Sequence, residues 1–315
     1  AEKCAAAELR AVGLDAEEAA ASARWLLQSA YGAGAGWRES LAEAVGRRAR
    51  REPVQYIVGS WPFYPLEQEV VVRPPVLIPR PETEELVDTV VRACRDAGTP
   101  PRRVLDIGSG SGVIAVSLLH VFPSATAVAV EPGEAAAELT EENARRNGVM
   151  GRLEIARLTA AEWAEEAAEA DFDLIVSNPP YIPSSELPGL QPEVRDFEDA
   201  AALDGGEDGL DVVRQVLRCA RRAGAPGARV YLEVHHTHPA VFERAAGSSG
   251  LPAEGGRGQP EALVGDGLSL VRTFRDAFGQ PRFVELQVER SADGAPGARA
   301  HVAPSGAPLP GAGEK

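Results

Sequence analysis

Apolar positions along the chain change their spacing near residue 52, and this change separates two kinds of structure. From Glu2 to Arg51, apolar side chains recur every three or four residues, as they do on one face of a helix. A Gly-Ala-Gly-Ala-Gly run at 32–36 interrupts this pattern. Residues 1–52 are therefore expected to form a small helical domain of roughly three or four helices.

Residues 53–80 carry short β-branched and aromatic runs separated by prolines. Such side chains favour extended structure, and prolines restrict it to short or edge strands. We therefore expect a β-hairpin linker over 53–80. The Arg-Pro-Glu-Thr-Glu segment that begins at Arg80 then predicts a helix, because Pro suits the first turn and carboxylates suit the positive end of the helix dipole.

Over residues 81–290, apolar runs of strand length alternate with helical segments. This alternation predicts an α/β domain in which helices cover both faces of a mostly parallel sheet. The strands are expected near 103–107, 125–130, 152–156, 172–177, 228–234, 268–274 and 282–288, and the helices near 112–120, 133–147, 159–168, 208–223 and 238–247.

Two stretches lack a regular apolar pattern. Residues 250–267 are rich in Gly and Pro, and residues 291–315 are almost wholly small or polar. Neither offers enough apolar surface to offset the entropy lost when a chain is ordered. A flexible insertion and a disordered tail are expected.

Composition is ordinary for a globular protein, but the chain is acidic. Its 315 residues are 44% hydrophobic and 25% charged, with a formal net charge of −15. An acidic surface repels phosphate backbones, so direct sequence-specific nucleic-acid binding is not expected. No apolar run reaches the length of about 18 residues that predicts a membrane span. The three cysteines are far apart and predict neither a disulfide framework nor a zinc site.

Two further clusters of polar residues are expected to be structural. The basic run at 47–51 closes a helical stretch, where cations suit the dipole; a solvated face is expected, with a docking surface as the alternative. His235, His236 and His238 follow a predicted strand, but no thiol or carboxylate motif accompanies them. A solvated loop is expected there, and no metal site.

A glycine-rich turn follows the predicted strand at 103–107. Asp106–Gly112 reads Asp-Ile-Gly-Ser-Gly-Ser-Gly, which differs from the dinucleotide fingerprint GxGxxG and has no phosphate-binding Lys after it. Glu131 ends the next strand, where a carboxylate can accept both hydroxyls of a ribose. Alone, the glycines also fit a turn without a ligand. Together with Glu131 they favour a nucleoside without a pyrophosphate, and S-adenosylmethionine is the leading candidate.

An Asn-Pro-Pro-Tyr segment at 178–181 follows the apolar run 172–177. Its two prolines fix φ and remove two backbone donors, so the turn is stiff. The Asn178 side chain and the Pro179 carbonyl supply two acceptors for a planar NH2 group, against which Tyr181 can pack. A rigid turn with no ligand is the alternative for this segment alone.

These motifs resemble those of class I methyltransferases that alkylate planar nitrogen. Within that group, residues 53–59, 77–84 and 275–283 are similar to the HemK/PrmC release-factor glutamine methyltransferases. The resemblance runs from Glu2 to about Glu289. It implies a Rossmann-like, seven-stranded, mostly parallel sheet with a small N-terminal helical domain that recognises the substrate.

The resemblance also implies an activity. This is S-adenosylmethionine-dependent N5-methylation of the glutamine in the Gly-Gly-Gln motif of peptide-chain release factors, with S-adenosylhomocysteine as the product and no metal. A monomer is expected. The segments 74–76 and 82–87 resemble the eukaryotic mitochondrial form, which implies the mitochondrial matrix, with the bacterial cytoplasm as the alternative.

The resemblance assigns roles to individual residues as well. Trp163 would form the adenine wall, although Leu158-Thr159 stands where the family often has Gly-Asp, and a helix residue packed on the sheet is the alternative. Arg80 and Thr83 would line the pocket entrance, with helix capping as the alternative for Thr83. The expected cofactor residues are Gly108, Ser109, Gly110, Ser111, Gly112, Glu131, Trp163 and Asn178; the catalytic residues are Asn178, Pro179 and Tyr181; and the substrate is bound by Asn178, Pro179, Pro180 and Tyr181.

Two other functions stay open at this point. One is adenine N6-methylation of DNA or RNA, because the same turn can hold the exocyclic amine of a flipped base. The net charge of −15 counts against it. The other is a non-catalytic scaffold that keeps the fold, against which the intact glycine turn, Glu131 and Asn-Pro-Pro-Tyr segment argue.

Overall fold

The computed structural model describes the whole chain except residues 33, 167–170, 248–262, 266 and 290–315. The flexible insertion expected over 250–267 therefore lies largely outside the described residues. The disordered tail expected over 291–315 lies wholly outside them.

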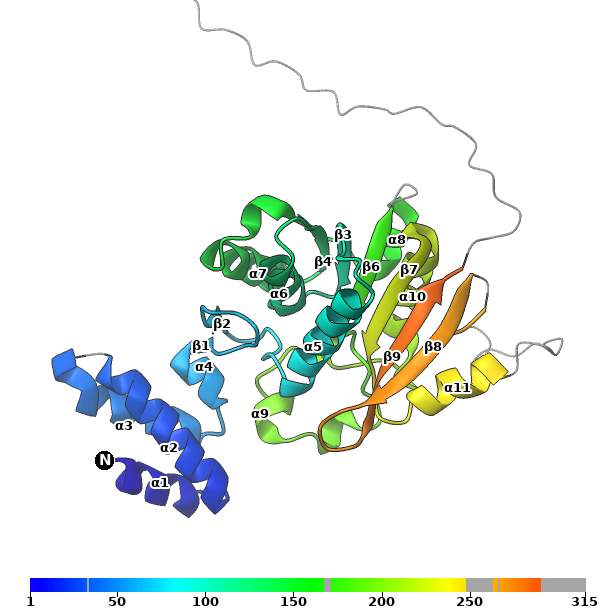
Figure 1. The fold of residues 1–315 in the computed structure, drawn as a ribbon. Helices are drawn as coiled ribbons and strands as arrows, with labels where there is room; N and C mark the ends of the chain where they lie inside the picture. The colour runs from blue at the N-terminus through cyan, green and yellow to red at the C-terminus, as the bar shows by residue number, and fades with distance from the viewer. Residues whose placement is uncertain (33, 167–170, 248–262, 266, 290–315) are drawn as a thin grey trace, which may run out of the picture.

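A seven-stranded sheet with the order β5-β4-β3-β6-β7-β9-β8 forms the centre of the larger part of the molecule (Figure 1). Strands β3 to β7 run parallel, whereas β9 is antiparallel to both of its neighbours. The expected mostly parallel sheet is thus confirmed, with each strand near its predicted position. The strands are β3 (Arg103–Ile107), β4 (Thr126–Val130), β5 (Leu153–Ala156), β6 (Phe172–Ser177), β7 (Gly224–Glu233), β8 (Leu268–Arg275) and β9 (Pro281–Val288).

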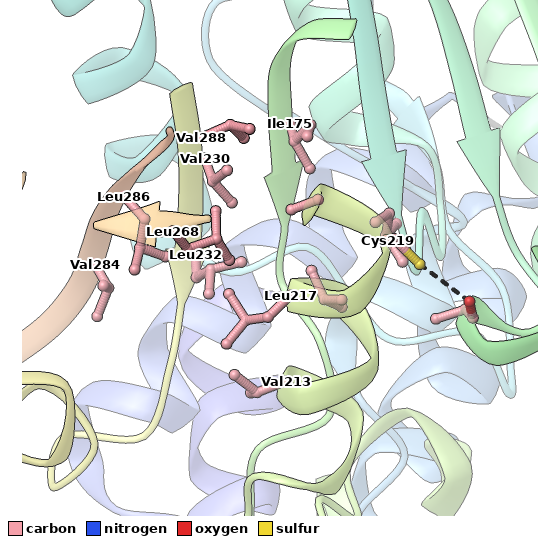
Figure 2. Close-up of a cluster of buried hydrophobic side chains, with 14 of the residues drawn as sticks. Ile175, Val213, Leu217, Cys219, Val230, Leu232, Leu268, Val284, Leu286 and Val288 are labelled. Atoms are coloured by element: carbon pink, nitrogen blue, oxygen red, sulfur yellow. Dashed lines mark hydrogen bonds between the residues drawn. The ribbon is translucent and has the colours of Figure 1, made fainter. Parts of the chain in front are cut away.

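Helices cover both faces of the sheet, and each face has its own apolar core. Figure 2 shows part of one core, where Val213 and Leu217 of α10 approach Val230 and Leu232 of β7. The helices of this face are α8 (Ala160–Glu166), α10 (Asp211–Ala223) and α11 (Pro239–Gly247); those of the other are α5 (Pro81–Asp96), α6 (Val113–Val121) and α7 (Glu134–Arg146). The loops carry α9 (Pro192–Arg195) and short 3-10 turns at Met150–Arg152, Leu187–Gly189 and Ala200–Ala202.

The N-terminal helices pack around a third apolar core. They are α1 (Glu2–Ala11), α2 (Ala16–Tyr31) and α3 (Trp37–Ala49), with a 3-10 turn at Gly34–Gly36. Asp15 caps α2 by accepting the backbone N–H groups of Glu17 and Glu18. Among the described residues, no helix is both long and apolar enough to cross a membrane.

The linker contains a short antiparallel strand pair, as expected, but its first part is not extended. Its first part forms a helix, α4 (Val54–Val58), and its strands, β1 (Ser60–Trp61) and β2 (Val70–Val71), pair antiparallel over two residues each. Residues of α4 pack against the N-terminal core, so tertiary contact overrides their β propensity. The domain boundaries at residues 52 and 80 stay predictions.

The basic run at 47–51 also differs from expectation, because it is not simply a solvated face. The Arg48 side chain is only 3% exposed and its Nη1 lies 2.8 Å from Glu193 Oε1. Arg51 Nε lies 2.6 Å from the same oxygen. A buried guanidinium needs a carboxylate partner, and Glu193 of α9 supplies it from the other part of the chain. These ion pairs hold the N-terminal helices to α9.

Candidate active site

The carboxyl ends of the central parallel strands open onto one cavity of about 470 Å³. Gly108 follows β3, Glu131 follows β4 and Asn178 follows β6, and all three line it. Parallel strands end at the same edge of a sheet, which is where open α/β folds bind ligands. Most other lining residues are apolar or small, including Ile107, Val130, Pro132, Ala160, Pro179 and Pro180.

The glycine-rich turn owes its shape to its glycines. Gly108, Gly110 and Gly112 have φ values of 73°, 56° and 81°, which other residues rarely adopt. A Cβ atom at Gly112 would also lie 2.9 Å from Thr140 Cγ2, so no side chain fits there. Beneath the turn, the buried Asp106 accepts the backbone N–H of Ala115 at 3.0 Å. Burial raises the pKa of the Asp106 carboxyl to about 7.

Glu131 connects this turn to the second strand end. One carboxylate oxygen accepts the N–H of Gly110 and the other accepts the N–H of Gly133, both at 2.8 Å. Burial raises the pKa of Glu131, and the two N–H donors oppose that shift by favouring the charged form. The carboxylate thus borders the cavity while it anchors two loops.

The Asn-Pro-Pro-Tyr turn is held from behind by side chains of three elements. Ser177 Oγ donates to the Ile107 carbonyl at 2.6 Å, which ties the end of β6 to β3. Asn178 Nδ2 donates to Thr83 Oγ1 of α5 at 3.0 Å. Tyr181 OH donates to Glu233 Oε1, at the end of β7, at 3.0 Å. Asn178, Pro179 and Pro180 line the cavity, whereas Tyr181 is not among its lining residues in the described chain.

Glu233 is the main residue of this region that sequence reasoning missed. It is fully buried and receives hydrogen bonds from both Tyr181 and Thr83, whose hydroxyl donates to Oε2 at 2.8 Å. Burial raises its pKa to about 7 against the effect of these two donors. One signal was present in the sequence: Glu233 directly follows the run Val-Tyr-Leu at 230–232, as Glu131 directly follows the apolar end of β4.

Three expected site residues lie elsewhere. Trp163 is buried in the core, with its ring centroid 6.0 Å from that of Phe172, because α8 turns it toward the sheet; the adenine-wall assignment is therefore corrected. Thr83 is 3% exposed and lies behind the turn, not at a pocket entrance. Arg80 pairs with Glu198 at 2.5 Å and lines a separate cleft of about 340 Å³ beside the N-terminal helices.

The remaining turn residues contribute through the backbone or through neighbours. Ser109 Oγ lies 3.1 Å from Thr140 Oγ1, and the Ser111 carbonyl accepts from Asn143 Nδ2 at 2.9 Å. Neither serine is among the cavity-lining residues of the described chain. Thr159 lines the cavity at the position where a family Asp was expected, but its hydroxyl donates to Glu162 at 2.8 Å.

The linker supplies one wall that the sequence did not predict. Pro75, Val76 and Leu77 line the cavity. They are held there because the Pro75 carbonyl accepts the Asp199 N–H at 2.7 Å and the Val76 carbonyl accepts Tyr56 OH at 2.7 Å.

The histidine loop is only partly solvated, because two of its three histidines are buried and His236 alone is exposed. His235 is 9% exposed and His238 is 2% exposed, and His238 Nε2 lies 3.0 Å from the Asp208 carbonyl oxygen. Burial lowers the pKa of His238 to about 4, so the ring is neutral near pH 7. Across the described residues, no group of three or more His, Cys, Asp or Glu side chains is arranged to hold a metal ion.

Comparison with known proteins identifies the family. Residues 83–188 match the family model described as methyltransferase small domain. The human MTRF1L release factor glutamine methyltransferase is 39% identical over 258 residues, which span 79% of this chain and 71% of the human one. The release factor glutamine methyltransferase of Thermosynechococcus vestitus is 39% identical over 78% of each chain, and that of Geobacter sulfurreducens is 46% identical over 60% of this chain and 63% of its own.

The strand order, the cavity at the carboxyl ends of β3, β4 and β6, and these relatives agree with one another. The expected class I methyltransferase fold is thereby confirmed, with its small N-terminal set of helices. On the strength of sequence identity sustained over most of both chains, this protein belongs to the release factor glutamine methyltransferase family.

Proposed function

We propose that the protein methylates the side-chain nitrogen of a glutamine, the Gly-Gly-Gln glutamine of a peptide-chain release factor, with S-adenosylmethionine as the methyl donor. The observation that carries this proposal is the orientation of Asn178 at the cavity edge. Its NH2 group is engaged by Thr83, and no hydrogen bond to its Oδ1 is found among the described residues. An amide oxygen is therefore available to accept an N–H from a ligand.

The donor site is supported by the lining of the cavity. A volume of about 470 Å³ falls within the range of small-molecule sites. Glu131 would accept the ribose hydroxyls, the backbone around Gly108 and Gly110 would admit the methionine end, and the apolar surface of Val130, Pro132 and Ala160 suits a flat ring. When bound, S-adenosylmethionine supplies a methyl group carried on a positively charged sulfur.

The acceptor site follows from the stiffness of the Asn-Pro-Pro-Tyr turn. Asn178 Oδ1 and the Pro179 carbonyl would each accept one N–H of the glutamine amide, which fixes the plane of that amide. An amide nitrogen is a poor nucleophile because its lone pair is delocalised into the carbonyl. Two acceptors held in place would stabilise the positive charge that grows on this nitrogen during transfer, and they would do so without rearranging. The nitrogen would then lose one of its two N–H protons to water, which leaves the neutral N-methyl amide.

The direct test is mass spectrometry of a release factor after incubation with the enzyme and S-adenosylmethionine. We expect a gain equal to one CH2 group, located on the Gly-Gly-Gln glutamine. A release factor in which that glutamine is replaced by alanine is the matched control and should gain nothing. Methyl transfer to adenine in DNA or RNA oligonucleotides, with none to the release factor, would overturn the proposal in favour of a nucleic-acid enzyme.

A second arm separates an enzyme from a scaffold. Calorimetric titration with S-adenosylmethionine should show binding to the wild type, and labelled donor should yield methylated release factor. Binding with no transfer to either class of acceptor would contradict the proposal, and so would the absence of binding.

Two finer assignments are part of the same proposal. We place the protein in the mitochondrial matrix, supported by the human relative and by segments 74–76 and 82–87, and bacterial cytoplasm is the other outcome of a localisation experiment. We also expect a monomer, which light scattering coupled to size exclusion would test.

A further inference from the structure

A relay of hydrogen bonds runs behind the cavity from Asn178 to a single buried carboxylate. Asn178 Nδ2 lies 3.0 Å from Thr83 Oγ1, and Thr83 Oγ1 lies 2.8 Å from Glu233 Oε2. The other oxygen of Glu233 lies 3.0 Å from the hydroxyl of Tyr181. Glu233 therefore contacts Tyr181 at one end of the turn directly and Asn178 at the other end through Thr83, although it is not among the lining residues of the cavity in the described chain.

The chemistry of these groups gives the relay a direction. An ionised carboxylate only accepts hydrogen bonds, so the single proton of the Thr83 hydroxyl is directed at Glu233. Thr83 can then meet Asn178 only as an acceptor, and Asn178 must present its NH2 group. The amide oxygen of Asn178 is left on the opposite side, where it accepts no hydrogen bond from the described residues and can accept one from a ligand.

We infer that Glu233 is a positioning residue: through Thr83 and Tyr181 its carboxylate sets the orientation of the Asn178 amide and holds the Asn-Pro-Pro-Tyr turn. The inference deepens the proposed function and rests on it. The orientation of the Asn178 amide matters for the substrate. If the amide were rotated by half a turn, its NH2 group would face the NH2 group of the glutamine, two donors would meet, and the substrate amide would lose one of its two acceptors.

The surroundings of Glu233 fit this role better than a purely structural one. Among the described residues, Glu233 forms no ion pair, and the nearby Arg282 pairs with Asp276. No guanidinium in contact therefore offsets the free-energy cost of burying the Glu233 carboxylate. Burial raises its pKa, which means that the folded chain gives up stability to hold the charged form. A group kept for stability alone would be better served by a neutral side chain.

Three variants test the inference. Thr83→Val keeps the shape of the side chain and removes the hydroxyl, and Thr83→Ser restores it. Glu233→Gln keeps the shape of the carboxylate but replaces one oxygen by an NH2 group. The hydroxyl of either Thr83 or Tyr181 then faces a donor and can no longer donate its proton at residue 233. We expect kcat for methyl transfer to release factor to fall on the order of 100-fold in Thr83→Val and Glu233→Gln, since small misplacements cost this much. Thr83→Ser should recover most of that loss.

A matched control lies on the same face of the same sheet. Glu285 of β9 is also fully buried and also accepts a hydrogen bond from a tyrosine hydroxyl, that of Tyr231, at 2.9 Å. Its other partners are Arg272 and Arg229, so none of these contacts leads to the Asn-Pro-Pro-Tyr turn. Glu285→Gln should leave kcat per folded molecule within about twofold of the wild type.

The readouts separate positioning from folding. For Glu233→Gln we expect a melting temperature at pH 8 that is equal to or above that of the wild type, and an unchanged affinity for S-adenosylmethionine. The double variant Thr83→Val with Glu233→Gln should have a kcat no lower than that of either single variant, because both changes break the same relay. Wild-type activity in Thr83→Val or Glu233→Gln would overturn the inference, and so would a loss of activity that only follows a loss of folded protein. If the wild type itself fails to methylate release factor, the proposed function fails instead.

Discussion

Two buried glutamates on one face of the sheet show how the same side chain serves different ends. Glu233 of β7 and Glu285 of β9 are both fully buried, and each accepts a hydrogen bond from a tyrosine hydroxyl. Glu285 is also paired with Arg272 at 2.7 Å and with Arg229. Among the described residues, Glu233 instead accepts hydrogen bonds from two hydroxyl groups, those of Thr83 and Tyr181, and forms no ion pair.

The different partners of the two glutamates show at which of them the fold gives up stability. Around Glu285 each charge has an opposite partner, so the desolvation of the carboxylate is offset. Around Glu233 the carboxylate accepts hydrogen bonds from two hydroxyls, which favour its charged form, but burial outweighs them and raises its pKa to about 7. Ionisable groups left in this condition gather at functional sites, and Asp106, buried beneath the glycine turn, is another example on this edge of the sheet.

The largest effect is expected at the residue that the Glu233 relay serves. Asn178→Ala removes the proposed acceptor for the glutamine amide, so kcat should fall by at least about 100-fold, while S-adenosylmethionine affinity falls modestly. Single-turnover kinetics and calorimetry on the same sample measure both. If Asn178→Ala still transferred methyl groups at the wild-type rate, Glu233 would have no catalytic side chain to position. The proposed functional difference between Glu233 and Glu285 would then be wrong.

A smaller loss is expected at Glu131, which borders the cavity itself. Glu131→Gln keeps the shape but removes the charge that Gly110 N–H, Gly133 N–H and the proposed ribose hydroxyls share. We expect the Kd for S-adenosylmethionine to rise about tenfold, as for the loss of a charge-assisted hydrogen bond. Affinity equal to that of the wild type in calorimetry would argue that Glu131 only anchors the loops.

Stability should change most at the other glutamate. Glu285→Gln leaves Arg272 and Arg229 without their carboxylate, and the unfolding free energy should fall by about 1–2 kcal/mol, limited because both arginines are partly solvated. Urea denaturation measures this, with Glu233→Gln as the matched variant that should not lose stability at pH 8. Equal losses in both would mean that the two carboxylates play one structural role.

The smallest effect is expected from pH. The relay needs ionised Glu233, so kcat should fall several-fold as the pH drops below about 7, and this limb should be missing in Glu233→Gln. The free energy of unfolding should change in the opposite direction to kcat. The pKa of Glu233 is higher in the folded chain than in the unfolded one, so the folded chain is more stable at low pH and loses this stability as the pH rises through about 7. Besides Thr83 and Tyr181, the groups that act on Glu233 are Arg282 of β9, which lowers its pKa, and Glu82 of α5, which raises it. A wild-type profile that is flat from pH 6 to pH 8 would contradict this reading.

Much of the catalytic domain followed from the sequence. The seven strands and the helices on both faces were predicted because apolar periodicity records which face of each element is buried. The Asn-Pro-Pro-Tyr turn, the glycine turn and Glu131 were expected at one site because parallel strands end at one edge, and Asn178, Gly108 and Glu131 do line one cavity.

Other expectations failed where tertiary contact outweighed local pattern. Residues 54–58 form a helix because they pack on the N-terminal core, despite their β-branched side chains. Trp163 faces the sheet and not the cavity, since a helical residue's direction depends on which side of the helix meets the core. Arg48 is buried because Glu193, far away in the sequence, lies beside it.

By itself, the sequence determined the kind of fold, the turn chemistry and the family of the protein, since these depend on residue type and short spacing. Only the tertiary structure decided what stands behind Asn178. The partners in that relay, Thr83 and Glu233, come from elements that are distant along the chain, and no local pattern records that one hydroxyl lies 2.8 Å from one carboxylate. Such distances decide which group donates each hydrogen bond. In our proposal, the direction of these hydrogen bonds then decides which side of the Asn178 amide meets the substrate.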